Sequence, residues 1–161
     1  MSKFKTSPLT LKEANEFVLK YHRHNGKMPT HRFSIGAIYN NELVGVAIIG
    51  NPCSRRLNNK YLVEVRRLCV KDDSPKNTCS YLYGRCWNIW QMMGGKKIIT
   101  YTYASESGSS MRAVNWLNDH TVIPRKKEWN NWKSRKNRNE QISNYQLKFR
   151  WVKELNGKEK G

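Results

Sequence analysis

Apolar and polar residues follow two different periods along this chain, and each change of period marks the end of an expected element. A period near 3.6 predicts a helix over residues 11–21, and Thr10 with Glu13 forms a capping box at its start. A period of two predicts strands over residues 33–39 and 43–49, joined by a tight Asn-Asn turn. The first third of the chain therefore predicts a helix followed by a β-hairpin.

The next part of the chain is the most informative, because strands and helices alternate in it with short connections. The pattern predicts a long strand over residues 61–70, a helix over 78–93, a strand over 97–103, a short helix over 109–118 and a closing strand over 145–152. Asn, Ser, Thr and Gly fill the turns that open both helices. Backbone N–H groups at helix starts bind phosphate, so this stretch predicts an α/β core that holds a phosphorylated ligand.

Length and composition narrow the class of protein. A chain of 161 residues suits one domain, which we expect over residues 1–155 with a flexible tail over 156–161. No apolar run has the length of a membrane span, so we expect a cytoplasmic protein with no membrane partner. The four cysteines form no C-x-x-C pair and are expected to be reduced core thiols; a nucleophilic Cys79 at a helix start is the less favoured alternative.

The excess of positive charge indicates what kind of partner the protein binds. Thirty Lys and Arg residues against twelve Asp and Glu give a net charge of +18. Such an excess indicates a polyanionic partner, with nucleic acid favoured over a basic surface kept for solubility. Cations alternate with tryptophans between residues 125 and 138, and a basic loop spans residues 54–60. The predicted nucleic-acid contacts are Arg55, Arg56, Lys126, Lys127, Trp129, Trp132, Lys133 and Arg135.

Six short blocks stand in a recognisable order between residues 10 and 118. They are YHRHNGK at 21–27, a hairpin that closes with GNP at 50–52, EVRRL at 64–68, NTCS at 77–80, TYTY at 100–103 and GSSMRAVNW at 108–116. Their order resembles the Mom-type branch of GNAT-like bacteriophage proteins and a related uncharacterised phage family. The resemblance implies an α/β (α+β) fold with a GNAT-like mixed central sheet flanked by helices.

The chain departs from the Mom pattern at three positions. Tyr103 stands where Mom proteins have aspartate, Glu106 where they have histidine, and Met111 where they have tyrosine. The related phage family shares the ESGxS block at residues 106–110 and is the better fit. The usual GNAT phosphate loop, (Gln/Arg)-x-x-Gly-x-(Gly/Ala), is replaced by SPKNTCS at residues 74–80.

The resemblance also implies a chemistry. Mom proteins convert DNA adenine to a carbamoylmethyl form, with acetyl-CoA and iron implicated, so we expect acyl-CoA-dependent group transfer to nucleic acid, above all DNA. The residues implied to bind acetyl-CoA are Arg67, Leu68, Val70, Lys76, Asn77, Thr78, Ser80 and Asn115. Those implied in catalysis are His22, His24, Glu64, Tyr103 and Glu106. The alternatives are an acetyltransferase acting on protein lysine or a small amine, and a non-catalytic protein that binds nucleic acid or a host defence factor.

The two candidate acids have competing interpretations. Glu64 is a general base if burial raises its pKa, or else the partner of a neighbouring arginine. Strand alternation predicts that Arg66 shares its face and that Arg67 lies on the opposite one. Glu106 either orients a substrate amine or is an acid favoured by a helix dipole.

The remaining candidates lie in two loops and on one strand. His22, His24 and His31 fall within ten positions, and they either contact substrate or join Glu64 or Glu106 around iron or another metal. Asn77, Thr78 and Ser80 are expected to cap the helix that follows them and to bind phosphate. Tyr101 and Tyr103 stand where GNAT enzymes often keep a general acid.

Overall fold

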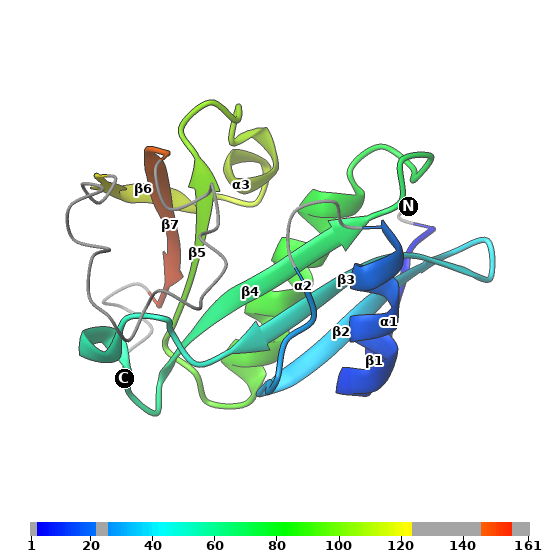
Figure 1. The fold of residues 1–161 in the computed structure, drawn as a ribbon, viewed down its shortest axis with the longest axis horizontal. Coiled ribbons are helices and arrows are strands. Elements are labelled where there is room, and N and C mark those ends of the chain that lie inside the picture. The colour runs from blue at the N-terminus through cyan, green and yellow to red at the C-terminus, as the bar shows by residue number, and fades with distance from the viewer. Residues whose placement is uncertain (1–2, 22–25, 124–145, 156–161) are drawn as a thin grey trace, which may run out of the picture.

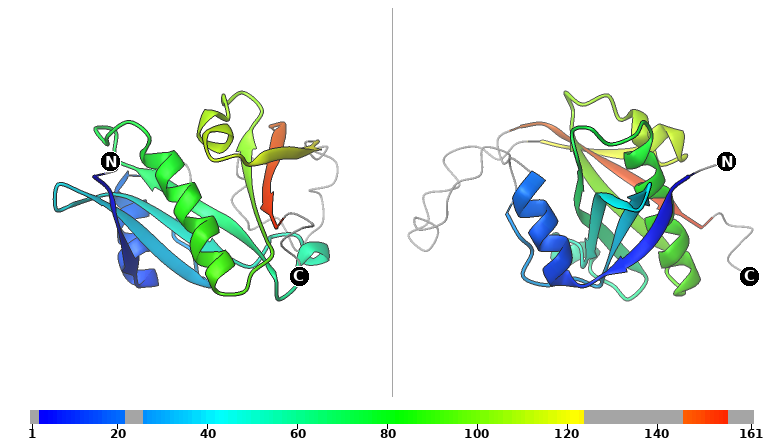
Figure 2. Two further views of the ribbon diagram at one scale, coloured as in Figure 1. Left: turned by 180° about the vertical axis from the view of Figure 1, so that it is seen from behind. Right: turned by 90° about the vertical axis from the view of Figure 1, so that its right-hand side faces the viewer.

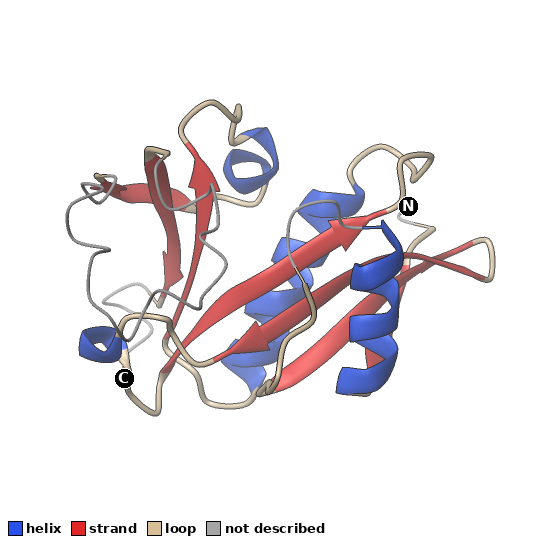
Figure 3. Ribbon diagram, viewed as in Figure 1, coloured by secondary structure: helices blue, strands red, loops and turns tan. Residues whose placement is uncertain are grey.

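A computed structural model describes residues 3–21, 26–123 and 146–155. In these residues seven strands form one sheet, with helices on both of its faces (Figures 1 and 3). The strands are β1 (Lys5–Leu9), β2 (Phe33–Tyr39), β3 (Glu42–Gly50), β4 (Leu62–Val70), β5 (Lys97–Tyr103), β6 (Leu117–Val122) and β7 (Lys148–Glu154). The helices are α1 (Leu11–Tyr21), α2 (Thr78–Met92), α3 (Ser109–Ala113) and the 3₁₀ turn η1 (Arg55–Leu57). None of the described helices is long and apolar enough to cross a membrane.

The predicted α1, the β2–β3 hairpin, β4, α2, β5 and β7 are all present, and the mixed sheet flanked by helices is confirmed. The capping box closes the start of α1: Glu13 N–H donates to Thr10 Oγ1 at 3.1 Å, and Thr10 N–H donates to Glu13 Oε1 at 3.0 Å. Asn40 and Asn41 both have positive φ, as a two-residue hairpin turn requires.

Two strands were not predicted, and one helix is shorter than predicted. β1 contains Pro8, which an edge strand tolerates but which reads as a break in the sequence. The helix expected over residues 109–118 ends at Ala113, because Asn115 takes a left-handed conformation with a φ of 62°. The residues from Leu117 onward then form β6, which pairs with β7.

The sheet separates two apolar layers. α1 packs on one face, where Phe17 and Val18 meet Val46 and Ile48 of β3. α2 packs on the other face, over a larger core that includes Ala47 and other alternate residues of the same strands. Figure 2 shows the two helices on opposite sides of the sheet. We refer below to the α1 face and the α2 face.

β4 and β5 run parallel and pair only at their first residues. The pairing stops at Glu64 opposite Ile99, and beyond it the two strands diverge (Figure 1). Just past the last pair, Thr100 Oγ1 donates a hydrogen bond to the Val65 carbonyl at 3.1 Å. A side-chain hydroxyl thus replaces the backbone N–H that the divergence removes, and the parting strands leave a gap between them.

A β-bulge in β4 overturns one prediction. Ile48 pairs with Arg67 while the next residue, Ile49, pairs with Val65, so Arg66 is the extra residue on β4. Paired residues share a face, and Ile48 faces α1, so Arg67 lies on the α1 face. Strand alternation alone put Arg67 opposite Glu64; the inserted residue brings it to the same side.

Candidate active site where β4 and β5 part

Glu64 is a buried acid on the α1 face, at the point where β4 and β5 part. It lies between Val63 and Val65, which point into the α2-side core, and is 5% exposed. Its Oε2 accepts from Arg66 Nε at 3.1 Å, and its Oε1 accepts from the Cys53 N–H at 3.4 Å. The ion pair with a neighbouring arginine is therefore present. Burial nevertheless raises the pKa of Glu64, and the charges of the nearby cations offset only part of that rise.

Tyr101 is the tyrosine that neighbours Glu64. It packs on the α1 face beside Leu62 and Ile99, and the Arg150 guanidinium hydrogen-bonds to its hydroxyl. Burial and the charge of Glu64 raise the pKa of Tyr101. The hydroxyl therefore keeps its proton at neutral pH, and it is a weaker acid than the hydroxyl of an exposed tyrosine. Arg150 is itself held by Asp119, which accepts from its Nε at 2.8 Å and its Nη2 at 3.1 Å.

Four half-buried cations surround this acid on the α1 face: Arg66, Arg67, Lys148 and Arg150. Lys148 acts on Glu64 and Arg150 contacts Tyr101, because β7 pairs with β5 and places the two cations opposite Tyr103 and Tyr101. Arg67 Nη1 donates to the carbonyl of the bulged residue at 2.8 Å, and its Nε donates to the Gly26 carbonyl at 3.2 Å. We call these four cations the positive wall; Arg66 and Arg150 are paired with Glu64 and Asp119.

The two other described residues predicted as catalytic lie further along β5. Tyr103 shares the face of Tyr101, with Lys148 Nζ 5.5 Å from its ring centroid. Glu106 is exposed in the turn after β5, where its Oε2 accepts the Tyr103 N–H at 3.2 Å. Glu106 thus stabilises a turn outside α3, and the structure does not bring it to Glu64.

A hollow of about 420 Å³ opens on the α2 face, between the start of α2 and α3. Its lining includes four predicted cofactor residues together with two serines of α3: Lys76, Asn77, Thr78, Ser80, Ser109 and Ser110. The N–H groups in the first turn of α2 have no partner within the helix, and Lys76 adds a positive charge. Hydroxyls, a cation and helix N–H groups fit the phosphates of an acyl-CoA.

The capping prediction at this helix start was wrong in detail. Asn77 is the residue before α2, but it has a left-handed backbone and its side chain caps no N–H group. Thr78 is buried and its hydroxyl donates to the Pro75 carbonyl at 2.6 Å, so it tightens the preceding turn. Of the set predicted here, Lys76 and Ser80 keep their polar groups available for a ligand at the hollow.

The remaining predicted cofactor residues are spread along the neighbouring elements. Leu68 and Val70 lie in β4 beyond the bulge and face the α2-side core, whereas Arg67 faces α1. Asn115 is exposed in the left-handed turn after α3, outside the lining of the hollow.

Several predicted residues lie outside the described part of the chain. They are His22, His24, Lys126, Lys127, Trp129, Trp132, Lys133, Arg135 and the tail over residues 156–161. Arg55 and Arg56 are described and exposed on η1, whose Leu57 packs beside Leu62 on the α1 face. These two arginines therefore extend the positive wall.

The described residues contain no group of three or more His, Cys, Asp and Glu side chains that could hold a metal ion. His31 Nδ1 lies 2.7 Å from Ser34 Oγ in a hydrogen bond. Iron, which the family resemblance implies, therefore finds no fitting ligand set in this part of the chain, and we derive no step through it.

The cysteines are all unpaired. Cys69 and Cys86 are buried and Cys79 is half-buried, whereas Cys53 is exposed, contrary to the prediction of a core thiol. Burial raises the pKa of Cys79, which leaves its thiol protonated and disfavours it as a nucleophile.

Sequence reasoning missed Lys148 and Arg150 as members of the site. Their signal was present, because they are alternate residues of a predicted strand and so share a face. The sequence did not show that this strand pairs with β5, and this pairing brings Lys148 near Glu64 and Arg150 to Tyr101.

Comparison with solved structures identifies the fold as that of the GNAT acetyltransferases. The ribosomal-protein-S18-alanine N-acetyltransferase from Escherichia coli superposes with a TM-score of 0.64 at 9% identity, covering 96% of both chains. A GNAT family acetyltransferase from Elizabethkingia anophelis with acetyl-CoA bound gives a TM-score of 0.62 at 13% identity, covering 96% of this chain and 100% of that one. A Bacillus subtilis acetyltransferase in complex with CoA gives 0.60 at 14% identity, covering 96% and 99%.

The sequence itself assigns the family. The profile of the Mom protein family matches residues 3–160, nearly the whole chain, and the chain belongs to that family. No curated protein matches it.

Proposed function

We propose that this protein transfers an acyl group from an acyl-CoA to nucleic acid, with DNA as the acceptor. One observation carries the proposal: the phosphate-suited hollow and the buried Glu64 lie on opposite faces of the sheet, beside the gap where β4 and β5 part. A donor held in the hollow would have to pass its acyl group between β4 and β5, where their pairing ends, to reach an acceptor on the α1 face. Membership of the Mom family and the GNAT fold support the same donor.

The α2 face would hold the donor. Lys76, Ser80 and the first-turn N–H groups of α2 bind its phosphates, and the serines of α3 close the other side. When bound, the donor supplies a thioester carbonyl that an amine attacks. Beyond Glu64, β4 has no ladder partner on its β5 side, and the carbonyls of Val65 and Arg66 accept from Thr100 Oγ1 and Arg67 Nη1 instead.

The α1 face would hold the acceptor. Arg66, Arg67, Lys148 and Arg150 form a positive wall, extended by the exposed Arg55 and Arg56. Phosphates of a nucleic acid are the ligands that such a wall binds best. An acceptor base inside a duplex must be turned out of its stack to reach Glu64, which is buried at the foot of the wall.

Two side chains would move the protons. Glu64 takes a proton from the attacking amine as the new carbon–nitrogen bond forms, and its raised pKa makes it a stronger base than an exposed glutamate. Tyr101 gives its hydroxyl proton to the sulfur as the carbon–sulfur bond breaks. The products are an acylated amine and a free thiol.

Nucleoside mass spectrometry tests the proposal. DNA and RNA from cells that express the chain are digested beside those from cells with Glu64→Gln and with the control Glu16→Gln, an exposed acid on α1. We expect a new mass in DNA for the parent and the control, reduced about 10²–10⁴-fold for Glu64→Gln. Unchanged nucleosides in both pools would overturn the nucleic-acid acceptor.

Binding of acetyl-CoA can be measured without knowing the acceptor, so it tests the donor by itself. Acetyl-CoA at a hundred times its Kd should raise the free energy of unfolding of the purified protein by about 2.7 kcal/mol. No thermal shift with acetyl-CoA would instead support a non-catalytic protein that keeps the fold.

A further inference from the structure

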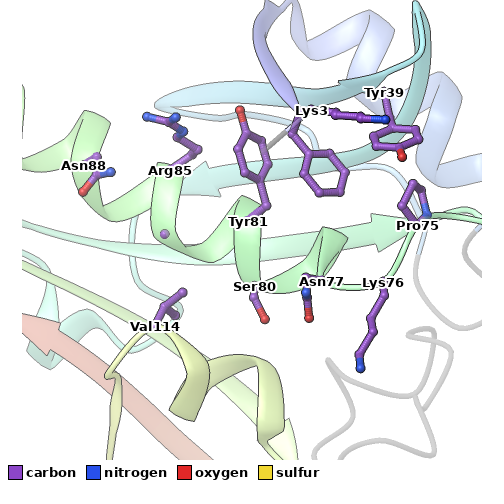
Figure 4. Close-up of a pocket in the computed structure, with 12 residues that line it drawn as sticks. Lys3, Tyr39, Pro75, Lys76, Asn77, Ser80, Tyr81, Arg85, Asn88 and Val114 are labelled. Carbon is purple, nitrogen blue, oxygen red and sulfur yellow. The ribbon is translucent and has the colours of Figure 1, made fainter. Parts of the chain in front are cut away.

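A second, larger hollow lies on the outer side of α2, away from the gap. Its volume is about 730 Å³, and it is walled by α2, the segment before β1 and the end of β2 (Figure 4). Its lining includes Lys3, Phe4, Asn77, Tyr81, Arg85 and Asn88. Arg85 and Asn88 stand one and two turns beyond Tyr81 on α2, and Lys3 and Phe4 come from the N-terminal segment.

The charge of this hollow is entirely positive. Lys3, Lys76 and Arg85 line it and are exposed, and none of its lining residues is acidic. Among the described residues these three cations form no ion pair, and all three are exposed to solvent. Three cations around one recess attract phosphate groups.

Aromatic stacking holds one of these cations in place. Phe4 stacks on Tyr81 with ring centroids 4.7 Å apart and planes inclined by 24°. The Arg85 guanidinium carbon lies 5.3 Å from the centroid of the Tyr81 ring. The hydroxyl of Tyr81 is fixed by a 2.7 Å hydrogen bond to Thr6 Oγ1. Arg85 is therefore preorganised as a planar donor, which suits two-point binding of a phosphate or stacking on a base.

We propose that this hollow binds a single strand of nucleic acid, outside the reaction site. The three cations bind successive phosphates, and Asn77, Ser80 and Asn88 offer hydrogen-bonding groups to sugar and base edges. A recess walled on three sides admits one strand, whereas a duplex presents its phosphates on a convex surface. The inference rests on the proposed function only in taking nucleic acid as the substrate class.

The hollow would hold the nucleic acid at a second point while a base reaches Glu64. Glu64 lies on the α1 face and this hollow on the α2 side, so a strand bound here does not occupy the acceptor wall. Because Lys76, Asn77 and Ser80 also line the smaller hollow, the nucleotide end of an acyl-CoA is the competing occupant that the experiment must separate.

The test uses residues that line only the larger hollow. We would compare the full chain with the double variant Lys3→Gln/Arg85→Gln and with the control Lys12→Gln, which removes an exposed cation from α1. Fluorescence anisotropy gives the Kd of an oligothymidylate of about ten nucleotides over a range of salt. Calorimetry gives the Kd of acetyl-CoA for the same proteins.

Loss of two phosphate contacts should reduce the slope of log K against log [salt] by about 1.4. Between 1 M and 0.1 M salt this difference corresponds to an affinity about 25-fold lower than that of the parent. The affinity for acetyl-CoA should stay unchanged, and Lys12→Gln should leave both properties close to the parent. The inference is overturned if the double variant keeps the parent's salt slope, or if it loses acetyl-CoA affinity instead.

The double variant removes Arg85, so weaker binding could also come from a disturbed Phe4–Tyr81 stack, and a second variant separates the two causes. Asn88→Asp adds a negative charge to the hollow and leaves the contacts of Phe4, Tyr81 and Arg85 in place, so it should also weaken oligonucleotide binding. Undiminished binding would count against the site. The two proposals fail separately: DNA modified equally by parent and hollow variants removes only this site, whereas hollow-dependent binding without modified nucleosides removes only the proposed function.

Discussion

Replacing Thr100 with valine tests whether one side chain ties β5 to β4 where their pairing ends. Thr100 is 3% exposed, and its hydroxyl donates to the Val65 carbonyl at 3.1 Å and hydrogen-bonds to the hydroxyl of Tyr83. Valine has nearly the same shape, so the substitution leaves no cavity and removes only these two interactions. Tyr83 is itself buried, so neither former partner regains water.

The cost follows from these two partners. A buried polar group that loses its hydrogen bond costs about 1–3 kcal/mol, and the extra methyl of valine offsets about 0.8 kcal/mol. With two partners, the net loss in the free energy of unfolding should be about 1–5 kcal/mol. For a chain of this length each kcal/mol lowers Tm by about 2–4 °C, so Tm should fall by roughly 2–20 °C.

Urea and thermal unfolding, followed by circular dichroism, measure this change. Thr100→Ser is the matched control, because it keeps the hydroxyl and loses one methyl group, at a cost of about 1 kcal/mol. Adding Tyr83→Phe to Thr100→Val should cost less than the sum of the single variants, since the double variant leaves no buried tyrosine hydroxyl unpaired. A Thr100→Val protein as stable as the parent would refute the reasoning.

Three further predictions concern Glu64 and the core. Because burial raises the pKa of Glu64, the acid limb of the pH profile of kcat/KM should lie above pH 4.5 and should vanish in Glu64→Gln. A raised pKa in the folded state means that the protein loses stability as the pH rises through that pKa. Glu64→Gln should therefore be at least as stable as the parent at neutral pH, and a clear loss of Tm there would contradict this. Gly95→Ala should cost about 1–3 kcal/mol in urea unfolding, because its Cβ would lie 2.1 Å from the ring of Trp90, and a neutral result would mean that the indole moves freely. Leu82→Ala should cost about 2–5 kcal/mol in the same assay, because this side chain is fully buried between α2 and the sheet, and a cost below 1 kcal/mol would show that the core collapses around the gap.

The elements that could be predicted are those whose signal lies within a few residues. Thr10 and Glu13 cap α1 through contacts three positions apart, and the Asn-Asn pair sets the hairpin turn through its own backbone preference. The helix after β4 and its polar start were also evident, since the periodicity and the stop at Gly94 are local. The helix predicted over residues 109–118 was too long, because the apolar period continues past Asn115 while the left-handed backbone of Asn115 ends the helix.

The candidate site was predicted only in part. Glu64 was expected either as a general base or as the partner of an arginine, and the structure shows it buried and paired with Arg66. Lys76 and Ser80 were expected at a phosphate-binding helix start and do line a hollow there. Glu106 had an equally strong sequence argument, yet its carboxylate accepts a backbone N–H of its own turn.

The sequence by itself determined the periods of the elements, the excess of positive charge and the family, because each is a property of the chain read in order. The tertiary structure decided which distant residues meet. The bulge at Arg66 moves Arg67 to the face of Glu64, and the pairing of β7 with β5 brings in Lys148 and Arg150. Both depend on strand register, which is fixed by the packing of whole layers and by no single segment, and so the site exists only in the folded sheet.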